Sequence, residues 1–413
     1  MDDRREDPPT AADPRSPRWG VALTAAGGEG LAASADWMRW VRDGRLPDSS
    51  DGAGFGVDFA SDLELLAEHG VGSLRWTIDW SRLETRPGAW DPDAVDHVTE
   101  VLRAARRAGI DVWAVLHDGP APGWFTDDQR GFLDEDGVRR TWPRHVDRVA
   151  ETFGDLVSAW VPVLDPFTRA REGYLWGTRP PGRRDEETFL SGLRALHRAS
   201  FEAWRLLSSG APPVVCCIDT CPVEAGTVSR EPDEREAARA RVREEERLRI
   251  GPWLRALRDG VLSIPGLGEV EIDGLAGSYD VVGITYRGAR TLFADGSEGP
   301  YPLDAPVAAD GRAPWTEGLG VVLRRLSDEL PGRRFAVLGT GLTAREDDWR
   351  TEVLNGSALE VSRAAADGVR VTTSFWEGAI DGWTPECGLA VPDGLVDRDR
   401  HPRPSLLALP GTR

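Results

Sequence analysis

The sequence predicts an α/β fold, a (β/α)8 barrel, from three observations. Short apolar segments alternate with amphipathic helical patterns along most of the 413 residues, which is typical of a parallel sheet covered by helices. Eight such apolar segments can be delimited, which is the strand count of a (β/α)8 barrel. No GxGxxG fingerprint follows the first of them, which argues against a doubly wound open sheet.

The predicted strands are apolar runs of strand length with helical patterns between them. The strands span residues 19–25, 72–80, 111–117, 157–165, 213–219, 280–286, 334–340 and 369–376. Several of the predicted helices end on glycine, as helices often do. The helices span residues 58–70, 94–109, 144–154, 186–207 and 352–368, and the acidic and arginine-rich segment 231–250 is predicted as a solvated outer helix. The glycine-rich segment 27–30 is predicted to be a loop.

The composition excludes several classes of function. A net charge of −19 repels nucleic acid over most of the surface. The four cysteines, Cys216, Cys217, Cys221 and Cys387, lack the spacing of a zinc site, and free thiols in a reducing cytoplasm are the preferred interpretation. The 17 tryptophans suit core packing first and the stacking of sugar rings second.

The two ends of the domain are set by composition. Residues 1–17 are charged and proline-rich without an apolar h-region, so they are predicted to form a disordered leader, neither a signal peptide nor an anchor. Residues 18–413 show no linker or repeat and are predicted to be one domain. No stretch of about 18 apolar residues exists, so we expect a cytoplasmic protein without a membrane partner. The oligomeric state cannot be read from the sequence.

Polar side chains gather at the carboxyl ends of the predicted strands, where a barrel carries its site. They are Asp79, His117, Asp118, Asp165, Asp219, Arg287 and Glu377, with Arg75, Trp80, Trp124, Tyr286 and Trp376 close by in the sequence. Taken singly, such an acid is more often a helix cap than a catalyst. Their coincidence at one rim favours a site that hydrogen-bonds hydroxyl groups and stacks a sugar ring.

Taken in order, these segments resemble glycoside hydrolase family 1, the β-glucosidase family. The segment "WGVALTAAGGEG" (19–30) is similar to the family's opening "WGVATSAYQIEG", and "RWTIDWSR" (75–82) to its "RFSISWSR". The segment "WVPVLDPFTRAREGYLWGTRPPG" (160–182) resembles the family's "WITFNEP…GY…G…PPG", and "SFWEGAIDGW" (374–383) its "YFVWSLLDNFEW". The resemblance covers roughly residues 18–408 and implies the family's barrel.

The resemblance also implies that the catalytic site is degenerate. The family hydrolyses β-glycosides with retention, using one glutamate as acid/base and a second as nucleophile. The acid/base falls on Asp165 and the nucleophile on Gly339, while the asparagine beside the acid falls on Leu164. Glycine cannot attack carbon, and shortening Glu to Asp withdraws the acid by about 1 Å, a misplacement that can cost about a hundredfold in rate.

Sugar-contacting positions of the family are replaced in part. Its histidine falls on Asp118, with His117 adjacent, its nucleophile-steadying tyrosine on Arg287, and the glutamate beside Trp383 has no counterpart. Further positions stay in register, namely Arg75, Trp124, Trp376 and Glu29. The expected substrate-binding residues are Arg75, His117, Asp118, Trp124, Arg287, Trp376 and Trp383, and the resemblance implies no metal or organic cofactor.

Three hypotheses follow. The first is a non-hydrolytic protein that binds a small-molecule sugar or glycoside. The second is an active O-glycosidase or transglycosidase with relocated carboxylates, Asp165 with Glu377 or Asp118, where a separation of about 6.5–9.5 Å implies inversion. The third is a structural or interaction barrel whose pocket is closed by Arg287 and the loop at 26–57. For the carboxylates, an ionic network with Arg287 and Arg75 is favoured over catalysis.

Overall fold

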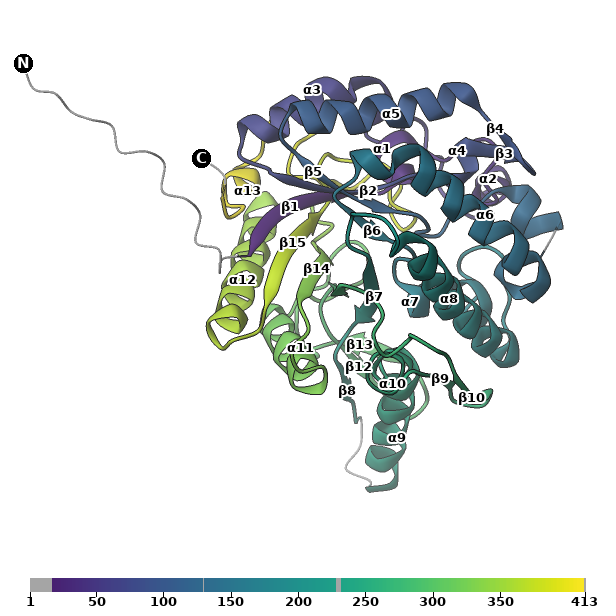
Figure 1. The fold of residues 1–413 in the computed structure, drawn as a ribbon. Coiled ribbons are helices and arrows are strands. Elements are labelled where there is room, and N and C mark those ends of the chain that lie inside the picture. The colour runs from purple at the N-terminus through teal and green to yellow at the C-terminus, as the bar shows by residue number, and fades with distance from the viewer. Residues whose placement is uncertain (1–16, 129, 228–231, 412–413) are drawn as a thin grey trace, which may run out of the picture.

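Eight parallel strands close into a barrel in the computed structural model, which describes residues 17–128, 130–227 and 232–411. The sheet order is β6-β5-β2-β1-β15-β14-β11-β7. The two end strands meet through a parallel bridge between Trp160 and Val214, and Trp160 N donates to Pro213 O at 2.9 Å. The predicted (β/α)8 barrel is therefore confirmed (Figure 1).

All eight predicted strands are present, with ends that differ by a few residues. The barrel strands are β1 (Arg18–Leu23), β2 (Ser73–Thr77), β5 (Asp111–Val115), β6 (Ala159–Val161), β7 (Val215–Thr220), β11 (Val281–Tyr286), β14 (Phe335–Thr340) and β15 (Val371–Glu377). Short strands outside the barrel form small sheets in the connections. They are β3 (Glu84–Arg86), β4 (Ala89–Trp90), β8 (Val223–Ala225), β9 (Val261–Ile264), β10 (Gly268–Glu271), β12 (Arg290–Leu292) and β13 (Glu298–Pro300).

Helices surround the barrel (Figure 1). They are α1 (Ala25–Glu29), α2 (Trp37–Arg42), α3 (Phe55–Glu68), α4 (Trp80–Leu83), α5 (Pro92–Arg107), α6 (Glu135–Phe153), α7 (Pro166–Ala170), α8 (Glu186–Leu207), α9 (Pro232–Arg249), α10 (Gly251–Asp259), α11 (Thr316–Glu329), α12 (Asp347–Ala366) and α13 (Pro404–Leu407). Every predicted helix is present. Helix α6 begins at Glu135 rather than at the predicted 144, and it contains Pro143, a residue that is uncommon in a helix interior.

The predicted loop at 27–30 is wrong in part, because most of it belongs to helix α1. The Thr24 hydroxyl accepts a hydrogen bond from Gly27 N at 3.0 Å and caps this helix. The helix ends at Gly30, whose φ of 73° suits glycine. The cap outweighs the low helix propensity of two consecutive glycines.

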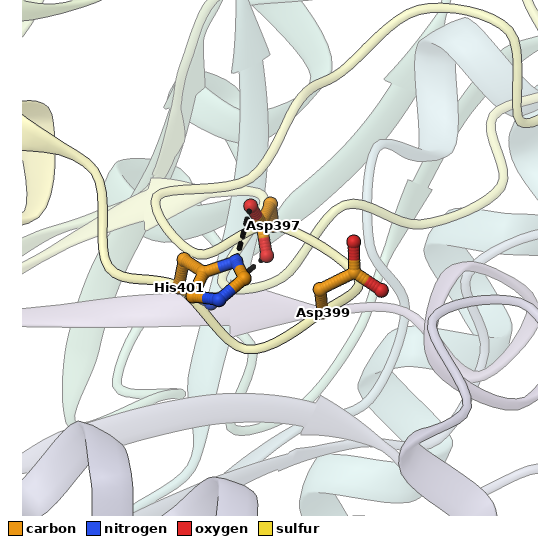
Figure 2. A group of neighbouring side chains, drawn as sticks. All are labelled: Asp397, Asp399 and His401. Atoms are coloured by element: carbon orange, nitrogen blue, oxygen red, sulfur yellow. Dashed lines mark hydrogen bonds and ion pairs between the residues drawn. The ribbon is translucent and has the colours of Figure 1, made fainter.

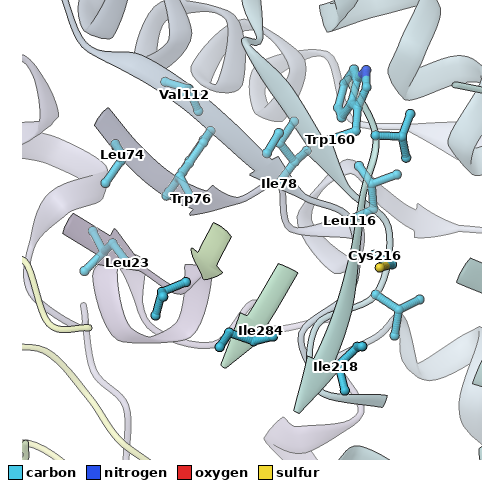
Figure 3. Packing of buried hydrophobic residues seen from close by; sticks show 14 of the residues in the cluster. Leu23, Leu74, Trp76, Ile78, Val112, Leu116, Trp160, Cys216, Ile218 and Ile284 are labelled. Carbon is cyan, nitrogen blue, oxygen red and sulfur yellow. The ribbon is translucent and has the colours of Figure 1, made fainter. Parts of the chain in front are cut away.

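The strands bury both of their faces, as parallel strands do. The barrel interior is filled by side chains that include Ala22, Trp113, Val161, Leu338 and Phe375. The alternate residues of each strand point outward to the helices. Figure 3 shows some of these outer residues, Leu74 and Trp76 of β2, Val112 of β5 and Ile284 of β11. This alternation decides which strand-end residues can reach the barrel opening.

The predicted leader of residues 1–17 lies almost wholly outside the described residues, which begin at 17, so its disorder stays a prediction. Among the helices of the described residues, none combines the length and the apolar character needed to cross a membrane.

Candidate functional site

A cavity of about 170 Å³ opens at the carboxyl ends of the barrel strands. This is smaller than the roughly 300–1,000 Å³ that is typical of ligand pockets. Its charged lining residues come from strand ends and following loops, and they are Arg75, Asp118, Asp165, Arg169, Arg287, Asp310, Arg312, Glu377, Glu386 and Asp393. Trp37 and Trp383 form the aromatic part of the wall. Cationic and carboxylate side chains therefore line the same small opening.

Asp165 lines the cavity and is held by three hydrogen bonds. It adopts a left-handed backbone conformation, φ 52°, at the turn where Pro166 begins α7. Such a conformation is uncommon for residues other than glycine and points to a functional constraint on the backbone. Its backbone N donates to Cys217 Sγ at 3.3 Å, the Thr285 hydroxyl donates to Oδ1, and Arg287 Nη1 donates to Oδ2 at 2.7 Å.

These contacts keep Asp165 ionised. Burial by itself raises the pKa of Asp165, but the charges of Arg287 and Arg169 and the hydrogen bond from Thr285 outweigh it and lower the pKa below its usual range. A general acid needs the opposite shift, since it must hold a proton near neutral pH. Asp165 in this state is an ion-pair partner.

Glu377, the last residue of β15, fills the space beside Gly339. A Cβ placed on Gly339 would lie 2.3 Å from Glu377 Oε1, 2.8 Å from Glu377 Cδ and 3.1 Å from Arg75 Nη1. The carboxylate of Glu377 therefore occupies the place that a side chain at 339 would need. Arg75 holds it there, with Nη2 3.4 Å from Glu377 Oε1 and Nη1 donating to Leu338 O at 2.7 Å.

Arg287 joins the two carboxylates. Its Nε donates to Glu377 Oε2 at 2.7 Å and its Nη2 to Glu377 Oε1 at 2.6 Å. Its Nη1 donates to Asp165 Oδ2 at 2.7 Å. Two parallel bonds to one carboxylate are the strong bidentate arrangement of arginine. Burial raises the pKa of Glu377, but the charge and hydrogen bonds of Arg287 outweigh it and lower the pKa from 4.5 to about 2.

The lowered pKa of Glu377 predicts a loss of stability in acid. The stabilising contribution of Glu377 is complete above about pH 4.5 and is lost as the pH falls towards about 2. We expect the urea midpoint of the wild-type protein to exceed that of Glu377→Gln at neutral pH and to converge on it through this window. The control is Glu100→Gln, because Glu100 pairs with Arg103 in a half-exposed site. A difference that stays constant with pH contradicts the prediction.

Asp118 differs from the other two carboxylates because no arginine donates to it in the described residues. The Thr77 hydroxyl donates to Asp118 Oδ2 at 2.7 Å. Burial raises the pKa of Asp118, although the Thr77 hydrogen bond and the charge of Arg169 oppose the rise. Asp118 lines the cavity and has the shift of a proton donor. Its side chain is available to a hydroxyl group of a ligand.

Of the nine residues predicted from the sequence, six line the cavity together, namely Arg75, Asp118, Asp165, Arg287, Glu377 and Trp383. Trp383 is 3% exposed, donates from Nε1 to Pro47 O at 3.2 Å, and meets Trp37 edge to face with ring centroids 6.4 Å apart. These contacts fix the indole in the wall. The sequence pattern thus located most of the opening, including both ends of the arginine bridge.

The other three predicted residues are not among the lining residues of this cavity. Trp376 is fully buried in the outer layer, because it precedes the inward-facing Glu377 on the same strand. Trp124 donates to Glu84 O at 2.7 Å and packs on Trp80. His117 packs on Phe132 at 4.9 Å, and burial lowers its pKa to about 3, so the ring is neutral.

Sequence reasoning missed several lining residues. Arg169 follows Asp165 by one helical turn in α7, a spacing that places the two side chains near each other. Arg312 with Asp310 and Glu386 come from long connections that carried no periodic signal. Loop residues of this kind are placed by tertiary packing and have no local sequence signature.

Among the described residues, one group of side chains has the composition of a metal site. Asp397, Asp399 and His401 have ligand atoms within 4.8 Å of one another, and none of the three lines the cavity. Figure 2 shows Asp397 and His401 turned toward each other. His401 N donates to Asp397 Oδ1 at 2.8 Å, and the ring Nδ1 lies 3.2 Å from Oδ2. We interpret the group as holding the loop in its turn.

The sequence model of glycosyl hydrolase family 1 matches residues 27–260. Among characterised proteins, beta-glucosidase 21 of Oryza sativa subsp. japonica is 30% identical over 151 residues, which is 36% of this chain and 29% of that protein. Beta-glucosidase 1B of Phanerodontia chrysosporium is 29% identical over 128 residues, 30% of this chain and 24% of that protein. The matched segments thus span less than a third of either relative.

Solved structures share the fold over nearly the full length. A beta-glycosidase from Pyrococcus horikoshii has a TM-score of 0.82 at 22% identity, covering 94% of this chain and 91% of that chain. A beta-glucosidase from Thermotoga maritima, in complex with deoxynojirimycin, has a TM-score of 0.82 at 18% identity, covering 96% of this chain and 97% of that chain. At these identities the similarity shows the barrel.

Proposed function

Because the chain belongs to glycosyl hydrolase family 1, we propose that it is a β-glucosidase-like pseudoenzyme that binds a sugar or glycoside at its barrel opening without hydrolysing it. The observation that carries the proposal is the Arg287 bridge between Asp165 and Glu377. Retaining hydrolysis needs one carboxylate that attacks carbon and one carboxylic acid that gives up a proton. Both groups here are ionised and paired to the same cation.

Gly339 supports the same conclusion. It offers no carboxylate at the position where the family resemblance places the nucleophile, and Glu377 takes up the free volume beside it. Glu377 is turned to Arg287 and Arg75, so its oxygens already have partners. A carboxylate held by two arginines is a poor nucleophile, because attack on carbon requires it to give up these ion pairs.

The remaining wall suits a small polyhydroxylated ligand. Asp118 presents a carboxyl group that is not engaged by an arginine, and Trp37 and Trp383 present indole rings. Carboxyl groups bind hydroxyls, and aromatic faces stack on the apolar face of a sugar ring. No nucleic-acid partner is proposed, since the net charge of −19 opposes one.

A second candidate function has a specific observation in its favour. Glu377 lies against Gly339, so a relocated pair of Asp165 and Glu377 already faces one space. If an incoming substrate displaced Arg287, this pair could act as a glycosidase or transglycosidase. We place it second because displacement must break three charge-assisted hydrogen bonds in a buried site.

The test combines hydrolysis with binding. We expect no release of nitrophenol from 4-nitrophenyl β-glucoside above the rate in buffer, and a saturable change in tryptophan fluorescence with methyl β-glucoside. The change should shrink in Trp383→Phe, because Trp383 lines the cavity, and persist in Trp204→Phe, whose indole packs on Phe201 in α8.

The other outcomes separate the alternatives. Turnover that disappears in both Asp165→Ala and Glu377→Ala establishes the relocated pair, and proton NMR of the first sugar anomer released tells retention from inversion. If the protein shows no turnover and no fluorescence response to a panel of glucosides, galactosides and mannosides, the proposed function is overturned. The structural or interaction barrel is then the remaining hypothesis.

A further inference from the structure

The space between Asp165 and Glu377 is occupied by a part of the chain itself. The guanidinium of Arg287 makes three hydrogen bonds of 2.6 to 2.7 Å to the two carboxylates. The side chain of Asp165 is 2% exposed and that of Glu377 is 23% exposed. Two carboxylates that share a buried space repel each other unless a cation lies between them. Arg287 supplies that cation from the end of β11.

The bridge is matched to its place in shape as well as in charge. Arginine presents five N–H donors in one plane, and three of them are used here. Thr285, two positions earlier and within β11, donates to the other oxygen of Asp165. Arg75 donates to Leu338 O and, at 3.4 Å, to Glu377 Oε1. Three residues, Arg287, Thr285 and Arg75, thus donate to the carboxylate pair.

We propose that Arg287 is a tethered cationic ligand that fills the space between Asp165 and Glu377 and sets the ligand class of the cavity. Neutral polyhydroxylated ligands bind beside it, and basic sugar analogues, which need the carboxylates for their own charge, are excluded. The part of this inference that concerns the neutral ligand rests on the proposed function. The exclusion of cations rests on the ion pairs alone.

The rest of the cavity agrees with a neutral ligand. The two N–H groups of Arg287 left over from its three bonds are donors for hydroxyl oxygens. Arg169 lines the same cavity, and its buried Nε has no hydrogen-bond acceptor among the described residues. Buried donors of this kind are normally satisfied, so an acceptor supplied by a ligand or by water completes the site. A hydroxyl group of a neutral ligand can serve as that acceptor, whereas a protonated amine would bring a further positive charge beside Arg169 and Arg287.

The experiment measures binding by calorimetry with two probes, deoxynojirimycin, a polyhydroxylated amine that is cationic when protonated, and neutral methyl β-glucoside. We compare wild type with Arg287→Gln, which removes the charge, and with Arg287→Lys, which keeps it. We expect deoxynojirimycin to bind Arg287→Gln about tenfold or more tightly than it binds wild type or Arg287→Lys. The affinity of methyl β-glucoside should differ far less among the three proteins.

Each outcome decides a separate point. Equal affinity of deoxynojirimycin for all three folded proteins overturns the inference. A gain in Arg287→Gln without binding of methyl β-glucoside to wild type upholds the exclusion of cations, and it counts against the proposed function and the neutral-ligand part that rests on it. If the melting curve shows that Arg287→Gln is unfolded, Arg287→Gln/Glu377→Gln is compared with Arg287→Lys/Glu377→Gln. Both double variants lack the buried Glu377 carboxylate and so avoid its repulsion with Asp165. The same tenfold criterion applies to that pair.

Discussion

Replacing Arg287 by alanine is expected to lower the free energy of unfolding by about 3–5 kcal/mol at neutral pH. The substitution leaves Asp165 and Glu377 buried in one space without the cation that both contact. The loss reflects the repulsion of two buried carboxylates that Arg75 and Arg169 compensate only in part, rather than the value of three hydrogen bonds. Urea unfolding followed by circular dichroism measures it, with the slope of the transition checked for two-state behaviour.

The matched control for this prediction is Arg103→Ala. Arg103 also forms a charge-assisted pair, with Glu100 at 3.0 Å, but both side chains are about half exposed, at 56% and 51%. Exposed pairs contribute about 0–1 kcal/mol. Equal losses for the two variants contradict the view that burial makes the Arg287 bridge costly to break. The double variant Arg287→Ala/Glu377→Ala should lose less free energy of unfolding than the sum of the losses in its two single variants, because each single variant leaves a charged partner of the removed side chain unpaired.

Gly339→Ala is expected to destabilise the protein by about 1–3 kcal/mol, although it adds a single methyl group. The new Cβ would lie 2.3 Å from Glu377 Oε1, closer than any van der Waals contact allows. Glu377 must then move and weaken its bonds to Arg287 and Arg75. Thermal and urea unfolding of Gly339→Ala measure the cost, and a neutral or stabilising effect contradicts the placement of Glu377.

Two further variants make this test specific. Gly72→Ala is the control, because a Cβ there meets no atom within 4 Å and Gly72 has no positive φ. We expect it to be neutral or slightly stabilising, since alanine reduces the entropy of the unfolded chain. In the Glu377→Ala background the cost of Gly339→Ala should largely disappear, because the clashing carboxylate is gone. Simple additivity of the two substitutions is the contrary result.

Local patterns were sufficient to predict the barrel. The helix at 186–207 was predicted to the residue and is α8 (Glu186–Leu207), because its apolar positions recur with helical spacing and an aspartate caps it. Helix ends were predicted less well. The helix predicted at 144–154 is α6, which already begins at Glu135 and contains Pro143, and the glycines at 27–30 were taken as a loop although Thr24 caps a helix there.

The candidate site, like the fold, was predicted in part from the sequence. The strand ends placed Asp118, Asp165, Arg287 and Glu377 at one rim, since parallel strands of a barrel end at a common face. Alternation along a strand lets Glu377 face the cavity only if its neighbour Trp376 faces outward, yet both were predicted as lining residues. The sequence does not show on which face of the sheet an aromatic residue at a strand end packs. The helices that pack against that strand decide it.

The sequence by itself determined the fold class and the residue types at the barrel rim, including the glycine at 339 and the aspartate at 165. Only the tertiary structure decided what those residues do to one another. Arg287 reaches Asp165 across 122 positions and Glu377 across 90. Glu377 enters the volume beside Gly339 because β14 and β15 are neighbours with an irregular register. Ion pairs and excluded volume depend on distances that barrel closure creates, and no local pattern encodes those distances.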